Sequence, residues 1–439
     1  MAACVAVGVL VVASNLHHAA RIGSAPTDAG ADKELVDAAE HPRYVAIEGE
    51  LQSMGIPVNL AELAATPLPD ARNAGPLYVQ MTDARQFPGS KPEDDSIRLI
   101  DPVSPSGAWA AAQTLISTQP RLIEIANRAG SMPECYISRS LAGDPQSILF
   151  PEVAQMGRAA RIISVESLLK AHEGQYAEAV GLQGEGFTIA HHAKTDLGLL
   201  FGNFVGLQCD ETTLAGMEKI LRSSGGAPKV AEAVDDTIAR NWHPTVPSEA
   251  LAHEVAVGNS EIRYLETEGP DALANYLPAL QPIPRDGLEW TGFIDLNGTT
   301  YLDLMERTIT AANLPYPSAI RQLSLIDVER AALPKKTSAV ADLLYPHAAG
   351  YCTSCCEVAA KAAVTRAACA VFLYQSKHGR YPSTLADAAP TAIDPFDGKL
   401  VGYRREANGF VVYSVGPTGQ YNGGAVDVTK EHEEAFRYP

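Results

Sequence analysis

Residues 151–180 read PEVAQMGRAARIISVESLLKAHEGQYAEAV, and this stretch decides the fold class. Apolar side chains recur in it at steps of three and four residues: Val153, Met156, Ala160, Ile163, Leu168 and Leu169. This period predicts an amphipathic helix. Gly174 interrupts the apolar stripe before it resumes at Tyr176, which predicts a turn between two helices.

The helical period continues to Leu221, and two shorter helical segments precede it. We predict one helix over 107–118 and another that follows Pro120. The turn at Gly174 resembles that of a tetratricopeptide hairpin, but no 34-residue period recurs along the chain. We therefore expect a mainly α protein whose body is an irregular helical bundle or a solenoid-like stack.

Acidic side chains outnumber basic ones by 52 to 34, which gives a net charge of −18. A nucleic-acid binder needs a basic surface to neutralise phosphates, so this composition argues against that class of protein. The acidic excess lies entirely in residues 1–350, because residues 351–439 are neutral overall. Such a change in charge predicts a domain boundary near Gly350.

Residues 2–13 form an unbroken run of apolar or small side chains. As a helix, twelve residues span about 18 Å, which is short of the roughly 30 Å of a bilayer core. We interpret residues 1–22 as a signal peptide or a truncated membrane anchor. A true start upstream of Met1 would supply the missing turns and the basic residues that normally precede such a run. The alternative is a buried N-terminal helix.

Composition divides the rest of the chain into four regions. Residues 23–105 combine small polar residues with closely spaced prolines, which predicts a linker and irregular structure. Residues 106–333 are expected to form the helical domain. Residues 334–354 are expected to be a second linker, and residues 355–439 a small α+β module with its own core.

The C-terminal module begins with an alanine-rich helix that should end at Gly379, because Pro382 prevents its continuation. Residues 400–405 and 410–415 predict the two strands of a hairpin, and an Asn-Gly pair between them suits its turn.

This order of features resembles the C-terminal part of the major pseudopilin of type II secretion systems. In that family a long helix precedes the elements G-x-Y-P and D-P-[FW]-G-x-x-Y-x-Y and a strand that ends in S-x-G-x-D-G. The matching residues are Gly379, Tyr381, Pro382, Leu385, Asp394, Pro395, Phe396, Gly398, Lys399, Tyr403, Phe410, Tyr413, Ser414, Gly416 and Gly419. A pseudopilin carries its anchor helix directly before this module, whereas about 350 residues precede it here. The chain as a whole is similar to large envelope-type proteins of planctomycetes, and this likeness implies no activity.

The pseudopilin resemblance implies a calcium site in the terminal loop. The candidate ligands in this sequence are Asp394, Asp397, Asn422 and Asp427. Calcium takes six to eight oxygen ligands and binds more tightly as the number of carboxylates rises. These few acidic residues predict that calcium is absent or weakly bound, and we expect no other cofactor.

Residues 352–356 contain a Cys-x-x-Cys element, formed by Cys352 and Cys355 and followed by Cys356. The second cysteine pair that a zinc site needs is missing. We expect these cysteines to be small buried residues, and a local disulfide or metal and redox chemistry are the alternatives. His191 and His192 are adjacent, so on a helix they point about 100° apart. We expect one to be buried and the other exposed, without a shared metal.

Two other patterns suggest binding loops. Asp295, Asn297, Asp303 and Glu306 match positions of an EF-hand loop, but the glycine that this loop requires is missing and a helix is the better prediction. The glycines at 181, 184 and 186 lack the preceding strand of a phosphate-binding loop, so we expect them to permit close helix packing.

The sequence contains no G-x-S-x-G motif of serine hydrolases. We therefore expect a non-catalytic envelope protein, exported or anchored by its N-terminal segment in the periplasm or cell envelope. It would act as a scaffold or as a component associated with assembly or secretion, with other envelope proteins or further copies of itself as partners. The alternative is an envelope hydrolase with its site in the helical domain.

Overall fold

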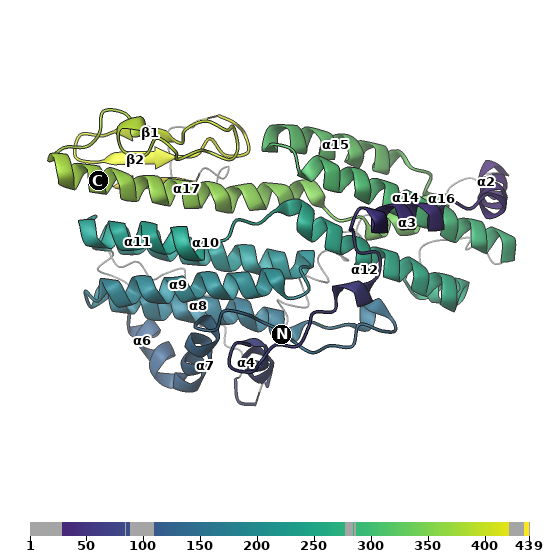
Figure 1. Ribbon diagram of the computed structural model, residues 1–439, viewed down its shortest axis with the longest axis horizontal. Coiled ribbons are helices and arrows are strands. Elements are labelled where there is room, and N and C mark those ends of the chain that lie inside the picture. Colours follow the sequence, from purple (N-terminus) through teal and green to yellow (C-terminus); the bar gives the residue numbers. More distant parts are fainter. Residues whose placement is uncertain are drawn as a thin grey trace.

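The computed structural model describes residues 29–83, 85–87, 109–276, 284, 287–420 and 434–438. The molecule is elongated and mainly helical, and α17 (Ala348–His378) runs along much of its long axis (Figure 1). A small antiparallel sheet lies against one end of α17. The predicted fold class, mainly α with a small α+β module at the C-terminus, is confirmed.

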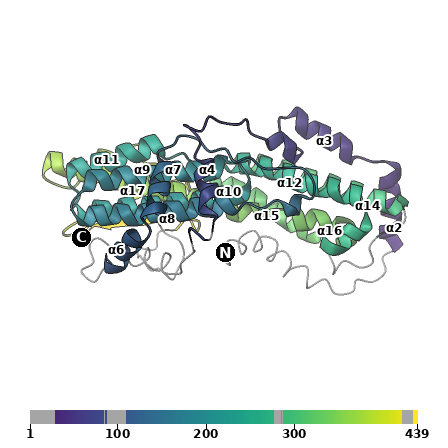
Figure 2. The same ribbon diagram turned by 90° about the horizontal axis from the view of Figure 1, so that it is seen from below.

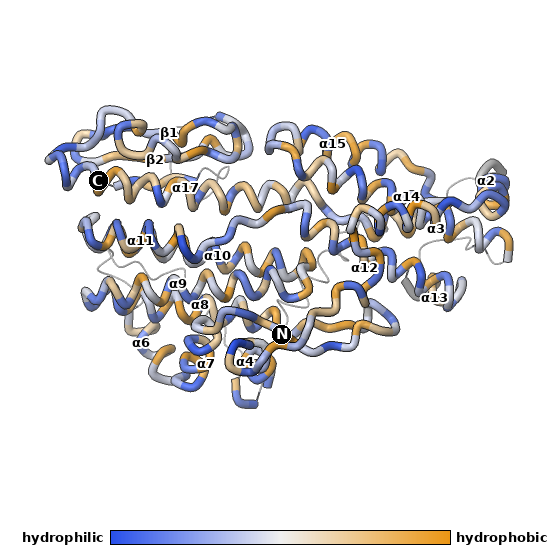
Figure 3. Tube along the Cα trace, in the orientation of Figure 1, coloured by the Kyte–Doolittle hydropathy of each residue, from blue (hydrophilic) through white to orange (hydrophobic). Residues whose placement is uncertain are grey.

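Three long helices form the centre of one half of the molecule: α8 (Pro151–His172), α9 (Tyr176–Thr195) and α10 (Leu200–Ser223). Gly174 has a φ of +79° in the turn between α8 and α9, a conformation that favours glycine. The predicted hairpin is therefore confirmed. Hydrophobic and hydrophilic residues are interspersed along these helices (Figure 3).

α9 and α10 lie close together because glycines face the neighbouring helix. A Cβ atom on Gly186 would lie 2.5 Å from Oγ1 of Thr213, and one on Gly216 would lie 2.1 Å from Nε2 of Gln183. These glycines lie inside helices, so the packing interpretation is correct for Gly186.

Shorter helices cover this half. α6 (Trp109–Thr118) and α7 (Pro120–Gly130) form where the sequence predicts them, and both pack on α8. α4 (Gly75–Met81) packs beside α7, and α11 (Pro228–Asn241) packs against both α9 and α17.

The other half is built on α12 (Pro247–Glu268) and α14 (Gly287–Ala312), which pack against each other. α15 (Tyr316–Ala332) and α16 (Lys335–Leu344) pack on α14, and the short α13 (Pro270–Tyr276) follows α12. Figure 2 shows the two halves side by side along the long axis.

The prediction of a linker and irregular structure over 23–105 is wrong for part of that region. α2 (Ala29–Glu40) and α3 (Tyr44–Ser53) are regular helices that pack on α14, and η1 (Leu60–Leu63) packs on α12. Gly292 of α14 permits the first contact, because a Cβ atom there would lie 1.7 Å from the carbonyl oxygen of Leu35.

The predicted linker over 334–354 is also wrong, because α16 and the start of α17 occupy it. The amide of Asn297, buried in α14, holds α16 in place. Its Nδ2 donates to the carbonyl oxygen of Thr337 at 3.1 Å, and its Oδ1 accepts from the backbone N–H groups of Val340 and Ala341 at 2.9 and 3.1 Å. These bonds satisfy backbone groups beside the kink at Ser338.

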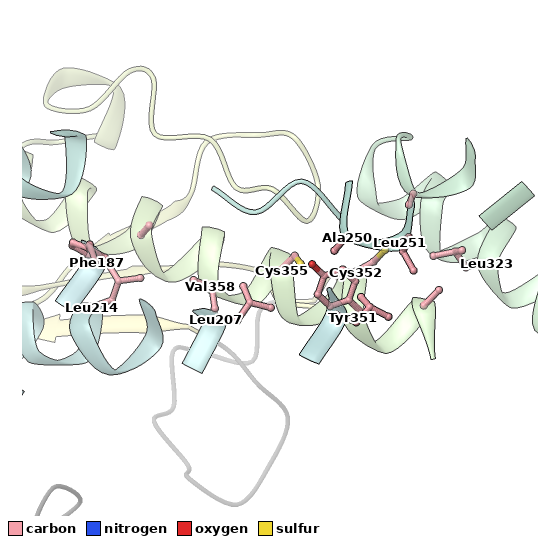
Figure 4. Close-up of a cluster of buried hydrophobic side chains, with 14 of the residues drawn as sticks. Phe187, Leu207, Leu214, Ala250, Leu251, Leu323, Tyr351, Cys352, Cys355 and Val358 are labelled. Atoms are coloured by element: carbon pink, nitrogen blue, oxygen red, sulfur yellow. The ribbon is translucent and has the colours of Figure 1, made fainter. Parts of the chain in front are cut away.

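α17 carries one apolar core from the body into the C-terminal module. Near its start, Tyr351, Cys352 and Cys355 pack against Leu251 of α12 and Leu207 of α10 (Figure 4). The same continuous cluster of buried side chains reaches the sheet. The boundary predicted near Gly350 therefore falls inside a helix rather than between two separately packed domains.

The sheet has the order β1-β2-β3, with β1 (Gly402–Arg405), β2 (Phe410–Tyr413) and β3 (Ala435–Tyr438). β1 and β2 form the predicted antiparallel hairpin. β3, which the sequence did not predict, pairs with β2 from the other side.

None of the described helices is both long enough and apolar enough to span a membrane. The predicted signal or anchor segment, residues 1–22, lies outside the described residues.

Candidate functional site

A buried ion cluster lies where the two halves of the molecule meet. Arg139, in the connection between α7 and α8, has a side chain that is only 7% exposed. Its Nε donates to Glu152 of α8 at 2.5 Å, and its two Nη atoms donate to the carboxylate of Asp196 at 2.9 and 2.6 Å. The guanidinium also lies over the ring of Phe150, 5.2 Å from its centroid. The bidentate geometry fixes Asp196, which ends α9.

The turn that follows Asp196 has an unusual backbone. Leu197 has a φ of +61° and is the only non-glycine residue with a positive φ in the described part of the chain. Gly198 has a φ of +69°, and a Cβ atom on it would lie 2.2 Å from Nδ1 of His253. The ring of His253, on α12, therefore packs directly against the backbone of the turn.

Side chains from both halves hold this turn. Nδ1 of His253 donates to the carbonyl oxygen of Leu197 at 2.8 Å, which places the proton on that nitrogen because a carbonyl can only accept. Nδ2 of Asn203 donates to the carbonyl oxygens of Gly198 and Leu199, both at 3.0 Å.

Glu254 closes the far side of the turn. The backbone N–H of Leu200, at the start of α10, donates to Oε2 of Glu254 at 3.3 Å. Burial raises the pKa of this carboxyl to about 7, although the Leu200 N–H acts in the opposite direction. The hydroxyl of Tyr301 donates to the backbone carbonyl of Glu254 at 2.9 Å, and the buried ring of Tyr351 lies nearby.

We call this region the junction; it comprises Arg139, Glu152, Asp196, the turn 197–199, Asn203, His253 and Glu254. Its side chains make structural contacts between the two halves of the molecule. Its arginine is paired with two carboxylates, and its histidine and asparagine bind backbone carbonyls. An open hollow of about 320 Å³ lies next to it between η1, α12 and the connection that contains Leu141. Its lining includes Ser260 and Glu268, and Oγ of Ser260 accepts from the N–H of Leu60.

A second open hollow, of about 500 Å³, lies between α4 and α7. Arg121, Glu124 and Arg128 line it from one face of α7, and Gln80 lines it from α4. Neither hollow brings a serine beside a histidine or two carboxylates together, which are the arrangements that a hydrolase site would need.

The structure describes two of the four calcium candidates of the C-terminal module, Asp394 and Asp397. Asp394 is buried, and its carboxylate accepts from Oγ of Ser414 at 3.0 Å and from the N–H groups of Phe396 and Val415 at 3.0 and 2.8 Å. It therefore ties the turn to the end of β2. Asp397 accepts from the N–H of Lys399, two residues further along the chain. The other two candidates, Asn422 and Asp427, lie outside the described residues.

The EF-hand-like stretch is part of α14, as the sequence predicts. Asp295 is buried there and accepts from the backbone N–H groups of Arg43 and Tyr44 at 2.8 and 2.9 Å. It thus satisfies the start of α3, a role that no local pattern could reveal because the partners are about 250 residues apart.

The cysteines and the histidine pair have structural surroundings. Cys352 and Cys355 are buried free thiols, and burial raises the pKa of Cys352 to about 12, so it is not a reactive thiolate. His192 is fully buried and bonded to Tyr78 and to a backbone carbonyl, whereas His191 is half-buried. No group of three potential metal-ligating side chains occurs among the described residues.

Glu166 of α8 and Glu185 of α9 face each other beside α7. Nδ2 of Asn127 donates to Glu166 at 3.0 Å, and Gly130, one turn further along α7, lies directly on Glu185. Burial, and then the charge of Glu166, raise the pKa of Glu185 to about 7. One oxygen of Glu185 is buried without a hydrogen-bond partner. Sequence reasoning missed this pair because their approach depends on how α8 and α9 pack.

We expect Glu185→Gln to stabilise the protein at pH 8 by on the order of 1 kcal/mol, after allowance for solvent screening. The folded state raises the pKa of Glu185 from 4.5 to about 7, so stability is lost as the pH rises through that interval. The gain should vanish near pH 4.5, where the carboxyl is protonated in the folded state. Urea unfolding at both pH values measures it, with exposed Glu232→Gln as the control. An equal gain at both pH values would contradict this assignment.

Comparisons with known proteins found no match to any family model, curated protein or solved structure. The residues of the junction are therefore assigned from their geometry alone. The sequence carries no motif around Arg139 or Glu254, so only the packing of the helices reveals them.

Proposed function

We propose that this protein is a non-catalytic scaffold of the bacterial cell envelope, attached through its N-terminal segment and able to bind other envelope proteins or further copies of itself. The observation that carries the proposal is the position of α2 and of the sheet at opposite ends of an elongated body (Figure 1). α2 follows the apolar run of residues 2–13 in the sequence. A chain attached before α2 would hold its C-terminal module away from the attachment point.

Two further features support a scaffold. α17 is a single helix of 31 residues, about 46 Å long, and it connects the two halves of the body with the sheet. Ionisable groups at the junction form structural contacts rather than lining a cleft. The resemblance of the C-terminal module to the major pseudopilin suggests components of a secretion machinery as the class of partner.

Cell fractionation tests the attachment. The full-length chain, produced in a bacterial host, should sediment with the membranes, resist extraction by high salt and be released by detergent. The matched control is a chain that starts at residue 29, which should be recovered in the soluble fraction. Recovery of the full-length chain only from the cytosol would contradict the proposal.

An envelope hydrolase remains the second candidate, and Glu166 with Glu185 is the observation that favours it. A carboxyl with a raised pKa beside a second carboxylate suits general acid and base catalysis. Assays with chromogenic ester and glycoside substrates would show turnover that Glu166→Gln and Glu185→Gln both abolish. Turnover that survives both substitutions would remove this pair from consideration.

A further inference from the structure

His191 and His243 lie side by side, although they come from different parts of the chain. The centroids of their imidazole rings are 4.9 Å apart, and the ring planes are inclined by 48°. His191 lies near the end of α9, whereas His243 lies in the connection between α11 and α12, which joins the two halves of the molecule. His191 is half-buried and His243 is exposed, so the pair is accessible from solvent.

The fold does not use the ring nitrogens of this pair. Among the described residues, neither imidazole forms a hydrogen bond or an ion pair through its ring. The neighbouring His192 differs, because its two ring nitrogens are bonded to the hydroxyl of Tyr78 at 2.8 Å and to the carbonyl oxygen of Met132 at 3.0 Å. The lone pair of a neutral imidazole is a common ligand of metal ions, and His191 and His243 each have one to offer.

A buried ion pair fixes the position of His243. Nζ of Lys194, which follows His191 on α9, donates to the backbone carbonyl of His243 at 3.0 Å and to the carboxylate of Asp210. The side chains of Lys194 and Asp210 are 9% and 2% exposed, so the ion pair is protected from solvent. It holds a residue of the connection beside α9. Asp210 also offsets the positive charge of Lys194, which would otherwise oppose a second cation there.

We propose that His191 and His243 together bind a divalent transition metal ion such as Zn²⁺, with water in its remaining coordination positions. Imidazole nitrogen suits zinc, copper and nickel ions, whereas Mg²⁺ and Ca²⁺ prefer oxygen ligands. A zinc–nitrogen bond of about 2.1 Å places the centroid of an imidazole about 3.2 Å from the ion, so two rings at a tetrahedral angle have centroids about 5 Å apart. The spacing of 4.9 Å meets this requirement.

The protonation state of His191 favours the metal. Burial lowers the pKa of this imidazole below its ordinary 6.5, and the charges of His243 and Lys194 act in the same direction. The ring is therefore neutral at pH 7.5, which is the form that binds metal ions. A bound ion joins α9 to the connection between the two halves, and it stabilises the folded state by mass action. This site is independent of the scaffold function proposed above.

Calorimetric titration of the full-length protein with Zn²⁺ at pH 7.5, in excess Mg²⁺, tests the proposal. His191→Gln and His243→Gln should each weaken the binding of one Zn²⁺ per chain by about tenfold or more, because each removes one of two protein ligands. The matched control is His172→Gln at the other end of the α8–α9 hairpin, which should leave the affinity unchanged. No binding at concentrations on the order of 1 mM, or binding that survives either substitution at His191 or His243, would overturn the proposal.

Chemical modification of the unaltered protein gives a second test that does not depend on the folding of a variant. Diethyl pyrocarbonate modifies accessible imidazole nitrogens, and mass spectrometry locates the modified residues. Zn²⁺ should protect His191 and His243 over the same range of concentrations, and it should leave the reactivity of His172 unchanged. Protection of only one residue of the pair would show that the two imidazoles do not share an ion.

Discussion

Replacing Arg139 by methionine is expected to lower the free energy of unfolding by about 3–5 kcal/mol, because Glu152 and Asp196 would then keep buried charges without a cation. The side chains of these two acids are 7% and 4% exposed, so water cannot easily replace the guanidinium. Chemical denaturation with urea, followed by circular dichroism, measures the loss.

A triple variant provides the matched control for this prediction. When Glu152→Gln and Asp196→Asn accompany Arg139→Met, no unpaired charge remains and much of the lost stability should return. If Arg139→Met alone costs less than 1 kcal/mol, the ion cluster does not hold the junction.

Phe410→Ala is also expected to lower the free energy of unfolding, by about 3–5 kcal/mol, because it empties the centre of an aromatic cluster. Phe410 is fully buried in β2. Its ring lies 5.1 Å from that of Phe372 on α17 and 6.0 Å from that of Phe436 on β3, measured between centroids. The ring therefore connects the sheet to the long helix.

Phe410→Leu is the control for Phe410→Ala, since it keeps most of the apolar volume and should cost less than about 1.5 kcal/mol. Because α17 also belongs to the core of the body, the alanine variant should lower the unfolding midpoint of the body as well as that of the sheet. A loss confined to the sheet would mean that the two parts are coupled only weakly.

The sequence predicted elements whose signals are local. The period in α8, the turn at Gly174 and the hairpin of β1 and β2 each depend on a few neighbouring residues. The end of α17 at Gly379, with a φ of +68°, is another example. Local propensity and tertiary packing agree in these places.

The errors lie where distant contacts decide the structure. α3 begins beside Asp295, and α16 is held by Asn297, so neither helix can be recognised from its own residues. Residues 334–354 look like a linker because they contain proline and glycine. Pro346 lies just outside α17, and Gly350 fits because a Cβ atom there would lie 2.4 Å from the ring of His347.

The junction was invisible in the sequence for the same reason. Arg139 contacts Asp196, and Glu254 contacts the N–H of Leu200, only when separate segments of the chain pack together. A basic residue in a loop and an acidic residue at the end of a helix are each ordinary in isolation. Their burial is what makes them important, and burial here is a property of the whole fold.

α17 makes the body and the C-terminal module one rigid unit, because one apolar core continues along it from the body to the sheet. Hydrogen exchange at increasing urea concentrations tests it by comparing the backbone N–H groups of Val411 and Val412 in β2 with that of Leu214 in α10. If the claim is correct, these groups share one opening free energy and one dependence on urea, because they exchange through the same global unfolding. Opening of β2 at a much lower free energy, with a weaker dependence on urea, would show that the module unfolds by itself and would contradict the claim.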